Sequence, residues 1–223
     1  MDINAYARQL SPAEIDAREH RALVGGMWEE IGALQFEFLK GRGLLPAHRL
    51  LDLGCGALRG GLHFIRFLDA GNYYGLDVNA SLIDAGNREL REAGLADRQP
   101  HLLVNAQFEL DRFAMAFDHA LAVSVFTHLP MNHIISCLVR TRQVLRPGAR
   151  LYASYFEAPA KAWLAPLAHP PGDMVSNYAS DAYHYAFEEM QWMADTAQLN
   201  VERIGEWGHP RGQMMLAFAG RDA

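Results

Sequence analysis

Short apolar runs alternate along the chain with longer stretches in which apolar residues recur every three or four positions. The runs predict strands at residues 50–53, 72–77, 101–104, 119–125 and 149–155, and a closing pair at residues 201–204 and 214–218. The stretches between them predict helices at residues 62–68, 81–93, 134–145 and 187–199. Strands that are apolar on both faces and separated by helices are typical of a parallel sheet covered by helices. The pattern therefore predicts an α/β protein.

Two further helices are predicted ahead of the first strand. The Ser-Pro-Ala-Glu sequence that begins at Ser11 has the spacing of a capping box, with proline at the first helical position. Apolar residues at helical spacing predict a second helix over residues 27–40. We therefore expect residues 1–48 to form a helical N-terminal cover and residues 49–223 to form the main domain.

The alternation of strands and helices stops between residues 157 and 186. Four prolines fall in this segment, and most of it has neither a helical nor a strand pattern. A connection of this length in a compact domain is often a lid or a binding loop. We therefore predict a lid-like insertion at about residues 157–186.

Composition and charge narrow the class of protein. The chain has 223 residues, is 50% hydrophobic and carries a formal net charge of −6, which suits one domain and disfavours binding to nucleic acid. No apolar run is long enough to cross a membrane, and no signal-peptide pattern opens the chain. Cys55 and Cys137 form neither a disulfide framework nor a zinc pattern, and no other metal-binding spacing occurs. We expect a cytoplasmic protein without a metal site.

The first predicted strand runs into a glycine-rich turn. Gly54 and Gly56 stand where the strand ends and a helix begins, a place where side chains would block a cofactor lying against the backbone. Arg59 occupies the position of the third glycine of a dinucleotide fingerprint, so that fingerprint fails. Asp52 would repel a pyrophosphate but suits an ammonium group, such as the α-amino group of S-adenosylmethionine.

A second acid ends the next predicted strand. Asp77 lies 25 residues after Asp52, at a position from which a carboxylate accepts hydrogen bonds from ribose hydroxyls in other nucleoside-binding sheets. The alternative interpretation is a helix cap beside an ordinary tight turn. Together with the glycine-rich turn, Asp77 favours a cofactor site.

From about residue 25 to residue 218 the chain resembles the class I S-adenosylmethionine-dependent methyltransferases. The resemblance rests on four motifs in the family's order, at residues 51–56, 75–77, 117–129 and 145–151. It implies a Rossmann-like seven-stranded sheet of order 3-2-1-4-5-7-6, with strand 7 antiparallel and helices on both faces. The closing pair of strands, predicted from the pattern alone, agrees with that topology.

The resemblance also implies which residues contact S-adenosylmethionine. Three of them follow the third strand and would lie beside the adenine. Arg59 is predicted to pair with the cofactor carboxylate, because a guanidinium binds a carboxylate through two hydrogen bonds; its alternative is a solvated arginine at a helix start. The full predicted set is Asp52, Gly54, Cys55, Gly56, Arg59, Gly60, Asp77, Val78, Asn79, Asn105, Ala106, Gln107, Ser124, Val125 and Phe126.

Three histidines are candidates for a general base. Methyl transfer to a hydroxyl requires removal of a proton, and histidine titrates near neutral pH. His128 follows the fourth predicted strand, His184 ends the insertion and His209 lies in the closing pair. Each of the three also fits a purely structural role.

We expect methyl transfer to a small molecule or a saccharide-like acceptor, in bacterial secondary or surface-glycan metabolism. The alternatives are a protein methyltransferase and a non-catalytic S-adenosylmethionine-binding module. The net charge disfavours RNA as the acceptor, and Asp52 with Arg59 disfavours a nicotinamide dehydrogenase. The sequence after the fourth strand, Ser-Val-Phe-Thr from Ser124, lacks the Asn/Asp-Pro-Pro-Tyr/Phe motif of enzymes that methylate amino groups of DNA bases. The oligomeric state is not predicted.

Overall fold

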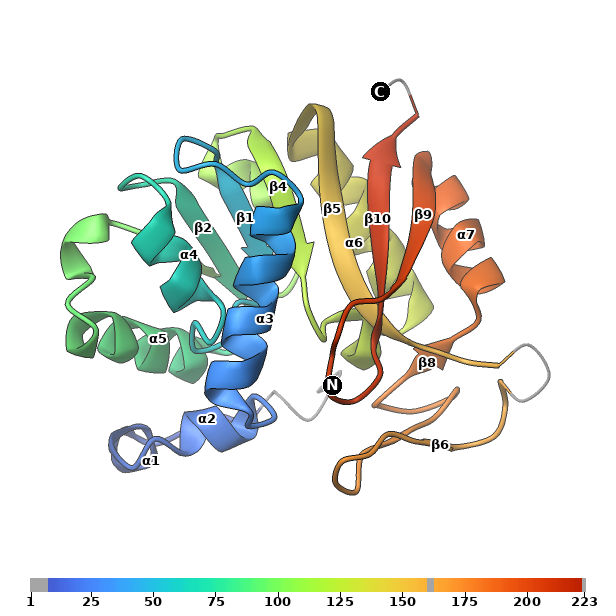
Figure 1. Cartoon of the computed structure of the whole chain (residues 1–223), viewed down its shortest axis with the longest axis horizontal. Helices are drawn as coiled ribbons and strands as arrows, with labels where there is room; N and C mark the ends of the chain where they lie inside the picture. The colour runs from blue at the N-terminus through green and yellow to red at the C-terminus, as the bar shows by residue number, and fades with distance from the viewer. Residues whose placement is uncertain (1–7, 160–162, 222–223) are drawn as a thin grey trace. The chain divides into compact units, whose positions relative to one another are not determined.

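The computed structural model describes residues 8–159 and 163–221. The chain falls into two compact units, one reaching Glu109 and the other starting at Leu110 (Figure 1).

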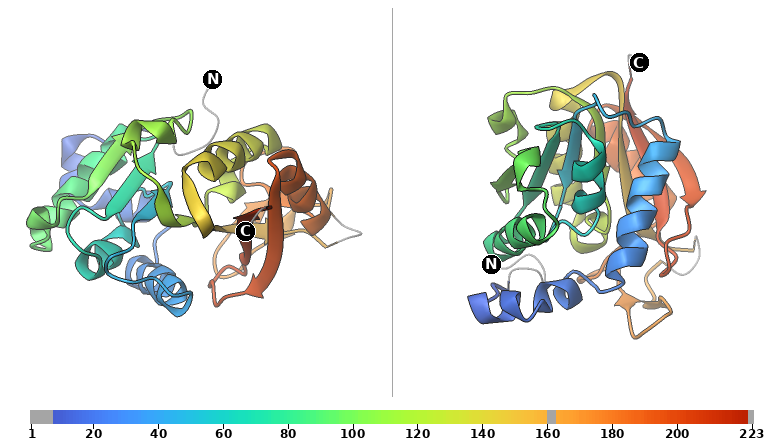
Figure 2. Two further views of the ribbon diagram at one scale, coloured as in Figure 1. Left: turned by 90° about the horizontal axis from the view of Figure 1, so that it is seen from above. Right: turned by 60° about the vertical axis from the view of Figure 1, so that its left-hand side comes forward.

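Within its described residues, 8–109, the N-terminal unit contains three parallel strands and five α-helices. Its strands are β1 (Leu50–Leu53), β2 (Tyr73–Asp77) and β3 (His101–Val104), in the order β3-β2-β1. Its helices are α1 (Pro12–Asp16), α2 (Glu19–Leu23), α3 (Trp28–Gly41), α4 (Gly61–Phe67) and α5 (Ala80–Glu92), with the 3₁₀ turn η2 (Ala96–Arg98). α4 and α5 pack on β2, and α3 packs on α4, beside which it runs in both views of Figure 2.

The predicted helix starts and strands of this unit are largely confirmed. Ser11 Oγ accepts a hydrogen bond from the Glu14 N–H, and Glu14 Oε2 accepts one from the Ser11 N–H, which completes the capping box of α1. β1 and β2 are buried along their whole lengths. β3 is not, because it is the edge strand and the flanking helices cover it incompletely: His101 and Val104 are exposed. The expectation of burial on both faces is therefore wrong for β3.

The C-terminal unit combines parallel and antiparallel pairing. Its main strands are β4 (Phe117–Ala122), β5 (Leu145–Glu157), β9 (Leu199–Glu206) and β10 (Met214–Gly220), in the order β4-β5-β10-β9. β4 is parallel to β5, and β10 is antiparallel to both of its neighbours. The helical elements are α6 (Met131–Val144), α7 (Phe187–Thr196) and the 3₁₀ turns η3 (Leu110–Phe113) and η4 (Phe126–His128).

The predicted strand order is 3-2-1-4-5-7-6. The N-terminal unit has the first part of it, as β3-β2-β1, and the C-terminal unit has the second part, as β4-β5-β10-β9, in which β10 is the antiparallel strand 7. The fourth strand ends earlier than predicted, at Ala122 rather than at residue 125. Ser124 has a φ of 59°, in the left-handed region that a strand does not tolerate, so the chain turns into η4. The helix predicted to reach residue 199 ends at Thr196. Gln198 just beyond it has a φ of 58°, which is also in the left-handed region and does not continue a right-handed helix.

The predicted insertion contains some regular structure. β6 (Leu167–Ala168) pairs with β7 (Val175–Ser176), and β8 (His184–Tyr185) pairs with β5. Residues 160–162, which belong to the predicted insertion, lie outside the described residues. A lid function for this segment stays a prediction.

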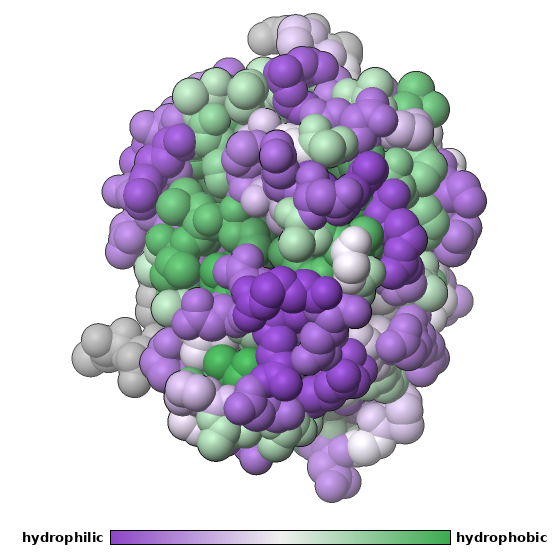
Figure 3. Space-filling model, turned by 90° about the vertical axis from the view of Figure 1, so that its left-hand side faces the viewer, coloured by the Kyte–Doolittle hydropathy of each residue, from purple (hydrophilic) through white to green (hydrophobic). Residues whose placement is uncertain are grey.

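Hydrophilic residues form a broad area with smaller apolar patches beside it on the face shown in Figure 3.

Within residues 8–159 and 163–221, none of the helices combines the length and the apolar character that a membrane span requires.

Candidate cofactor and acceptor sites

The glycine-rich turn leaves β1 through two residues in the left-handed region. Gly54 has a φ of 69° and Gly56 a φ of 54°. The N–H groups of Gly54 and Cys55 both donate to the Leu76 carbonyl, at 2.7 and 3.1 Å, which ties the turn to the end of β2. A Cβ at Gly56 would lie 3.2 Å from Val24 Cγ1. Glycine is needed here for its conformation, and Val24 borders the turn.

Two buried carboxylates lie beside this turn. Asp52 Oδ2 accepts a hydrogen bond from the Tyr73 hydroxyl at 2.6 Å. Asp77 accepts one from the Gly56 N–H at 2.9 Å and one from the Asn79 N–H at 2.8 Å. Both carboxylates have oxygen lone pairs to spare for donors of a ligand.

Burial dominates the electrostatics of this acid pair. It raises the pKa of Asp52 to about 7, helped by the charge of Asp77 and opposed by the Tyr73 hydroxyl and the Arg59 guanidinium. It also raises the pKa of Asp77, against the backbone N–H groups of Asn79 and Gly56 that lower it. A cationic ligand group would relieve part of this cost.

The small residues around the turn allow close packing. A Cβ at Gly75 would lie 2.8 Å from Cys55 Sγ, and a Cβ at Gly60 would collide with the Gln35 side-chain amide on α3. Cys55 is buried, and burial raises the pKa of its thiol well above the usual value. Cys55 is thus a wall residue and not a nucleophile.

Arg59 holds the polypeptide between α2 and α3. Its Nη1 donates to the carbonyls of Val24 and Gly26, at 2.8 and 2.9 Å. Both Nη1 hydrogens are then used, so binding of a cofactor carboxylate would fall to Nη2 and Nε. The predicted carboxylate contact of Arg59 is untested and stays a prediction.

The remaining cofactor contacts predicted for the N-terminal unit lie in the segments that follow β2 and β3. Asn79 caps α5 through its Oδ1, and Val78 before it is 46% exposed. The Asn105 N–H donates to the Asp77 carbonyl at 2.9 Å, which joins the two segments. Ala106 and Gln107 are exposed.

The side chain of Asn105 is used within its own turn. Its Oδ1 accepts from the N–H groups of Gln107 and Glu109, and its Nδ2 donates to Glu109 Oε2 at 2.7 Å. Glu109 was not singled out in the sequence, and no motif spacing marks it. An adenine contact from the Asn105 side chain would have to compete with these bonds.

The turn after β4 is held by a closed ring of hydrogen bonds in the C-terminal unit. The Ser124 N–H donates to Ser154 Oγ at 2.8 Å, and the Ser154 hydroxyl donates to Gln213 Oε1 at 2.6 Å. Gln213 Nε2 donates back to Ser124 Oγ at 3.0 Å. The Thr127 hydroxyl donates to the Ser124 carbonyl at 2.9 Å. This ring fixes the turn that leads to His128.

Val125 and Phe126 follow Ser124 in this turn. The Val125 carbonyl accepts from the His128 N–H at 2.9 Å. The Phe126 side chain is fully buried and packs edge-on against Phe218, with ring centroids 6.0 Å apart. A cofactor contact from Phe126 would therefore come from its backbone.

His128 forms a pair with an acid that the sequence analysis missed. Its Nδ1 lies 2.5 Å from Asp181 Oδ1, and both side chains are largely buried. The Tyr183 N–H donates to the Thr127 carbonyl at 2.6 Å, so the insertion is tied to the η4 turn next to His128. Histidine oriented by a carboxylate is an arrangement suited to a general base.

The other two predicted bases have different surroundings. His184 is fully buried, with its Nδ1 2.8 Å from Ser176 Oγ and its Nε2 2.6 Å from the Trp163 carbonyl. Both of its ring nitrogens are thus engaged inside the insertion. His209 is 6% exposed, and its Nδ1 accepts from the Arg211 N–H at 3.2 Å. Their catalytic roles are untested, and these contacts suit structural roles.

Among the described residues, no group of three or more histidine, cysteine, aspartate or glutamate side chains is arranged to hold a metal ion.

Comparison with known proteins shows similarity to methyltransferases. Residues 51–151 match the family model described as a methyltransferase domain. The ubiquinone/menaquinone biosynthesis C-methyltransferase UbiE of Vibrio campbellii is 29% identical over 166 residues, which cover 70% of this chain and 62% of that protein. The chain thus matches less than two thirds of this relative's length.

Solved structures show the same fold. The CcbJ methyltransferase from Streptomyces caelestis superposes with a TM-score of 0.70 at 14% identity, covering 99% of each chain. The magnesium protoporphyrin IX methyltransferase (ChlM) from Synechocystis PCC 6803, solved with bound SAM, superposes with a TM-score of 0.61 at 17% identity, covering 86% of this chain and 81% of that one.

Family match, motif order and fold agree. The chain resembles the class I S-adenosylmethionine-dependent methyltransferases in its match to the family model over residues 51–151, and it has their fold. S-adenosylmethionine is the cofactor of that class.

Proposed function

We propose that the protein transfers a methyl group from S-adenosylmethionine to a hydroxyl of a small-molecule or saccharide-like acceptor. The observation that carries the proposal is the pairing of a left-handed glycine turn with two buried carboxylates, joined by the Gly56–Asp77 hydrogen bond of 2.9 Å. A cofactor with an ammonium group, ribose hydroxyls and no phosphate matches that chemistry.

The N-terminal unit supplies the cofactor contacts. In this proposal Asp52 faces the ammonium group, Asp77 accepts from the ribose hydroxyls, and the turn of Gly54 and Gly56 lets the ligand approach the backbone. The segments after β2 and β3 form the adenine side, where Val78 offers an exposed apolar surface.

The proposed base is His128, which lies in the C-terminal unit. When bound, S-adenosylmethionine supplies the methyl carbon and a sulfonium leaving group. His128 Nε2 would take the proton of the acceptor hydroxyl while the bound cofactor would supply the methyl group to the hydroxyl oxygen. Asp181 orients the ring through Nδ1 and stabilises the imidazolium that forms. His184 and His209 are assigned positioning roles.

A two-stage experiment tests this function. Calorimetry with S-adenosylmethionine, S-adenosylhomocysteine and NAD is expected to show binding of the two sulfur compounds only. Incubation with methyl-labelled cofactor and a bacterial extract, split into small molecules, protein and RNA, is expected to label the small-molecule fraction.

Each alternative has its own outcome in that experiment. Label confined to protein would support a protein methyltransferase. Cofactor binding without label in any fraction, under conditions in which a known methyltransferase labels the same extract, would support a non-catalytic binding module. Binding of neither sulfur compound would refute the cofactor assignment itself.

A further inference from the structure

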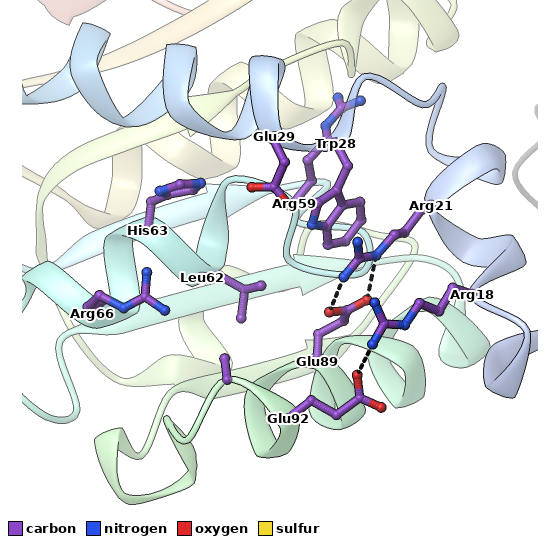
Figure 4. Close-up of a pocket in the computed structure, with 11 residues that line it drawn as sticks. Arg18, Arg21, Trp28, Glu29, Arg59, Leu62, His63, Arg66, Glu89 and Glu92 are labelled. Carbon is purple, nitrogen blue, oxygen red and sulfur yellow. Dashed lines mark hydrogen bonds and ion pairs between the residues drawn. The ribbon is translucent and has the colours of Figure 1, made fainter.

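Glu89 is a buried acid that the proposed methyl transfer does not use. It lies on α5 and is only 4% exposed. Arg21 binds it through two parallel hydrogen bonds, Nε to Oε1 and Nη2 to Oε2, both 2.8 Å long. His20 Nε2 lies 2.8 Å from the same Oε1, and His20 is fully buried (Figure 4 shows the Arg21–Glu89 pair).

Both partners of Glu89 come from the polypeptide ahead of α3. We call residues 8–27 the N-terminal strap. Burial raises the pKa of Glu89, but the hydrogen bonds from Arg21 and His20 outweigh it and leave the pKa below its usual value. Glu89 is therefore ionised near neutral pH, and it joins the strap to α5 through a buried, charge-assisted contact.

Aromatic and ionic contacts extend this junction. The Arg21 guanidinium lies 4.6 Å from the centroid of the Trp28 ring, and His20 meets that ring edge-on at 5.8 Å. Arg18 pairs with Glu92 one turn further along α5, at 2.9 Å. A pocket of about 260 Å³ is bordered by Arg18, Arg21, Trp28, Glu89 and Glu92, and Figure 4 shows these side chains around it.

The other end of the strap lies on the start of α5. The Leu10 N–H donates to Ser81 Oγ, and Asn79 Nδ2 donates to the Arg8 carbonyl, both at 2.8 Å. The Leu10 side chain packs with Ala57, Leu82 and Ala85. The strap is thus bound beside Asn79, two residues from the proposed ribose acid.

The strap also reaches the glycine-rich turn. Val24 Cγ1 borders Gly56, and the carbonyls of Val24 and Gly26 accept hydrogen bonds from Arg59. A ligand that lies against Gly54 and Gly56 would therefore lie close to the strap.

We propose that the N-terminal strap closes the cofactor site and that Glu89 is the positioning residue that holds it closed. This inference rests on the proposed function for the identity of the cofactor. The strap touches the turn at Gly56 and the segment after Asp77, so entry and release of the cofactor require it to lift. Replacement of Glu89 by glutamine removes the charge and leaves one acceptor oxygen, with an NH2 donor facing Arg21 in place of the other, and this favours the lifted strap.

Hydrogen exchange of the protein without cofactor gives the first test. In Glu89→Gln we expect the amides of residues 8–27 to exchange about tenfold or more faster, while those of β1 keep their rates, because loss of one charge-assisted contact changes a local equilibrium by about that factor. Asp84→Asn, the same charge change at an exposed position of α5, is the matched control. Uniform acceleration over the whole unit would mean that Glu89 only stabilises the fold and would overturn the proposal.

Release of S-adenosylhomocysteine gives the second test. We expect its dissociation rate, measured by displacement of labelled ligand, to rise about tenfold or more in Glu89→Gln and to stay unchanged in Asp84→Asn. Arg21→Gln, which alters a partly exposed side chain, is expected to act in the same direction and serves if Glu89→Gln does not fold.

The two failures are distinguishable. Unchanged release from a folded variant with normal ligand binding would overturn the role of Glu89 and leave the proposed function standing. A wild-type protein that binds neither sulfur compound would overturn the proposed function, and with it the cofactor part of this inference.

Discussion

Asp181 Oδ1 lies 2.5 Å from His128 Nδ1, although 53 positions separate the two residues in sequence. An ionised carboxylate only accepts hydrogen bonds, so the ring nitrogen that faces it carries the hydrogen. Nε2 is then the basic nitrogen of His128. The contact thus sets which of the two ring nitrogens takes up a proton.

Replacement of His128 by glutamine is expected to lower turnover about a hundredfold to ten-thousandfold, the range for loss of a general base, without weakening cofactor binding. Asp181→Asn is expected to lower turnover as well, because an amide nitrogen facing Nδ1 favours the opposite tautomer. Turnover would be measured with the acceptor found in the labelling experiment. His133→Gln, five residues further on, is the control, and unchanged turnover in both His128→Gln and Asp181→Asn would remove the base assignment.

Asp77→Asn is expected to weaken binding of S-adenosylmethionine about tenfold to a hundredfold, because a charged acceptor for the ribose hydroxyls is lost. Calorimetry measures the change directly. Asp84→Asn makes the same charge change at an exposed site of α5 and should leave the dissociation constant as it is. Equal affinities in the two variants would show that Asp77 caps its turn and does nothing more.

Asp52 gives the stability a pH dependence of unusual sign for an acid. An unfolded aspartate loses its proton near pH 4, whereas burial raises the pKa of Asp52 to about 7 in the folded protein. Between about pH 4 and 7 the folded state therefore binds more protons, and the contribution of Asp52 to the free energy of unfolding falls as the pH rises. Urea unfolding at pH 5 and pH 7 is expected to show a smaller fall in Asp52→Asn than in the wild type.

We expect cofactor binding to release the proton that the folded protein holds on Asp52. An ammonium group beside Asp52 favours the ionised carboxylate, so binding near pH 6 is expected to release protons. Calorimetry in two buffers of different ionisation enthalpy counts them, and Asp52→Asn is expected to release fewer. Equal proton release in the two proteins would place the ammonium group away from Asp52.

Gln213→Met breaks the hydrogen-bond ring that holds the turn after β4. The Ser154 hydroxyl is fully buried and loses its acceptor, so we expect the free energy of unfolding to fall by about 1–3 kcal/mol. Turnover should fall as well, since the turn leads to His128. Gln191→Met, on the exposed side of α7, is the control for both measurements. A stability equal to that of this control would mean that the ring contributes nothing.

Much of the fold follows from local patterns in the sequence. The apolar runs of β1 and β2 and the capping box at Ser11 lie within a few residues, so periodicity and spacing reveal them. The ends of β4 and α7 were misplaced because Ser124 and Gln198 adopt left-handed backbone conformations without being glycine. Tertiary hydrogen bonds, such as that from the Ser124 N–H to Ser154 Oγ, favour such a conformation, and no sequence spacing announces them.

The residues of the candidate site likewise fall into those that a local sequence pattern predicts and those that it does not. Asp52, Gly56 and Asp77 lie at strand ends, where the sequence pattern already indicates a binding function. Asp181 and Glu89 were missed because each acquires its role from partners more than fifty positions away. The sequence placed His128 after β4 but carried no sign of the carboxylate that orients its ring.

The histidines of the insertion form a hydrogen-bond chain with a single direction. The Trp163 carbonyl can only accept, so His184 Nε2 donates to it, and the Nδ1 of a neutral His184 then accepts from the Ser176 hydroxyl. The Ser176 oxygen in turn accepts from His169 Nε2, at 2.7 Å. Each donor therefore lies on the His169 side of its hydrogen bond and each acceptor on the Trp163 side. No single hydrogen bond of the chain can change direction unless its neighbours change as well. In their neutral forms His184 thus carries its hydrogen on Nε2 and His128 on Nδ1, so the two histidines have opposite ring nitrogens as their basic atoms.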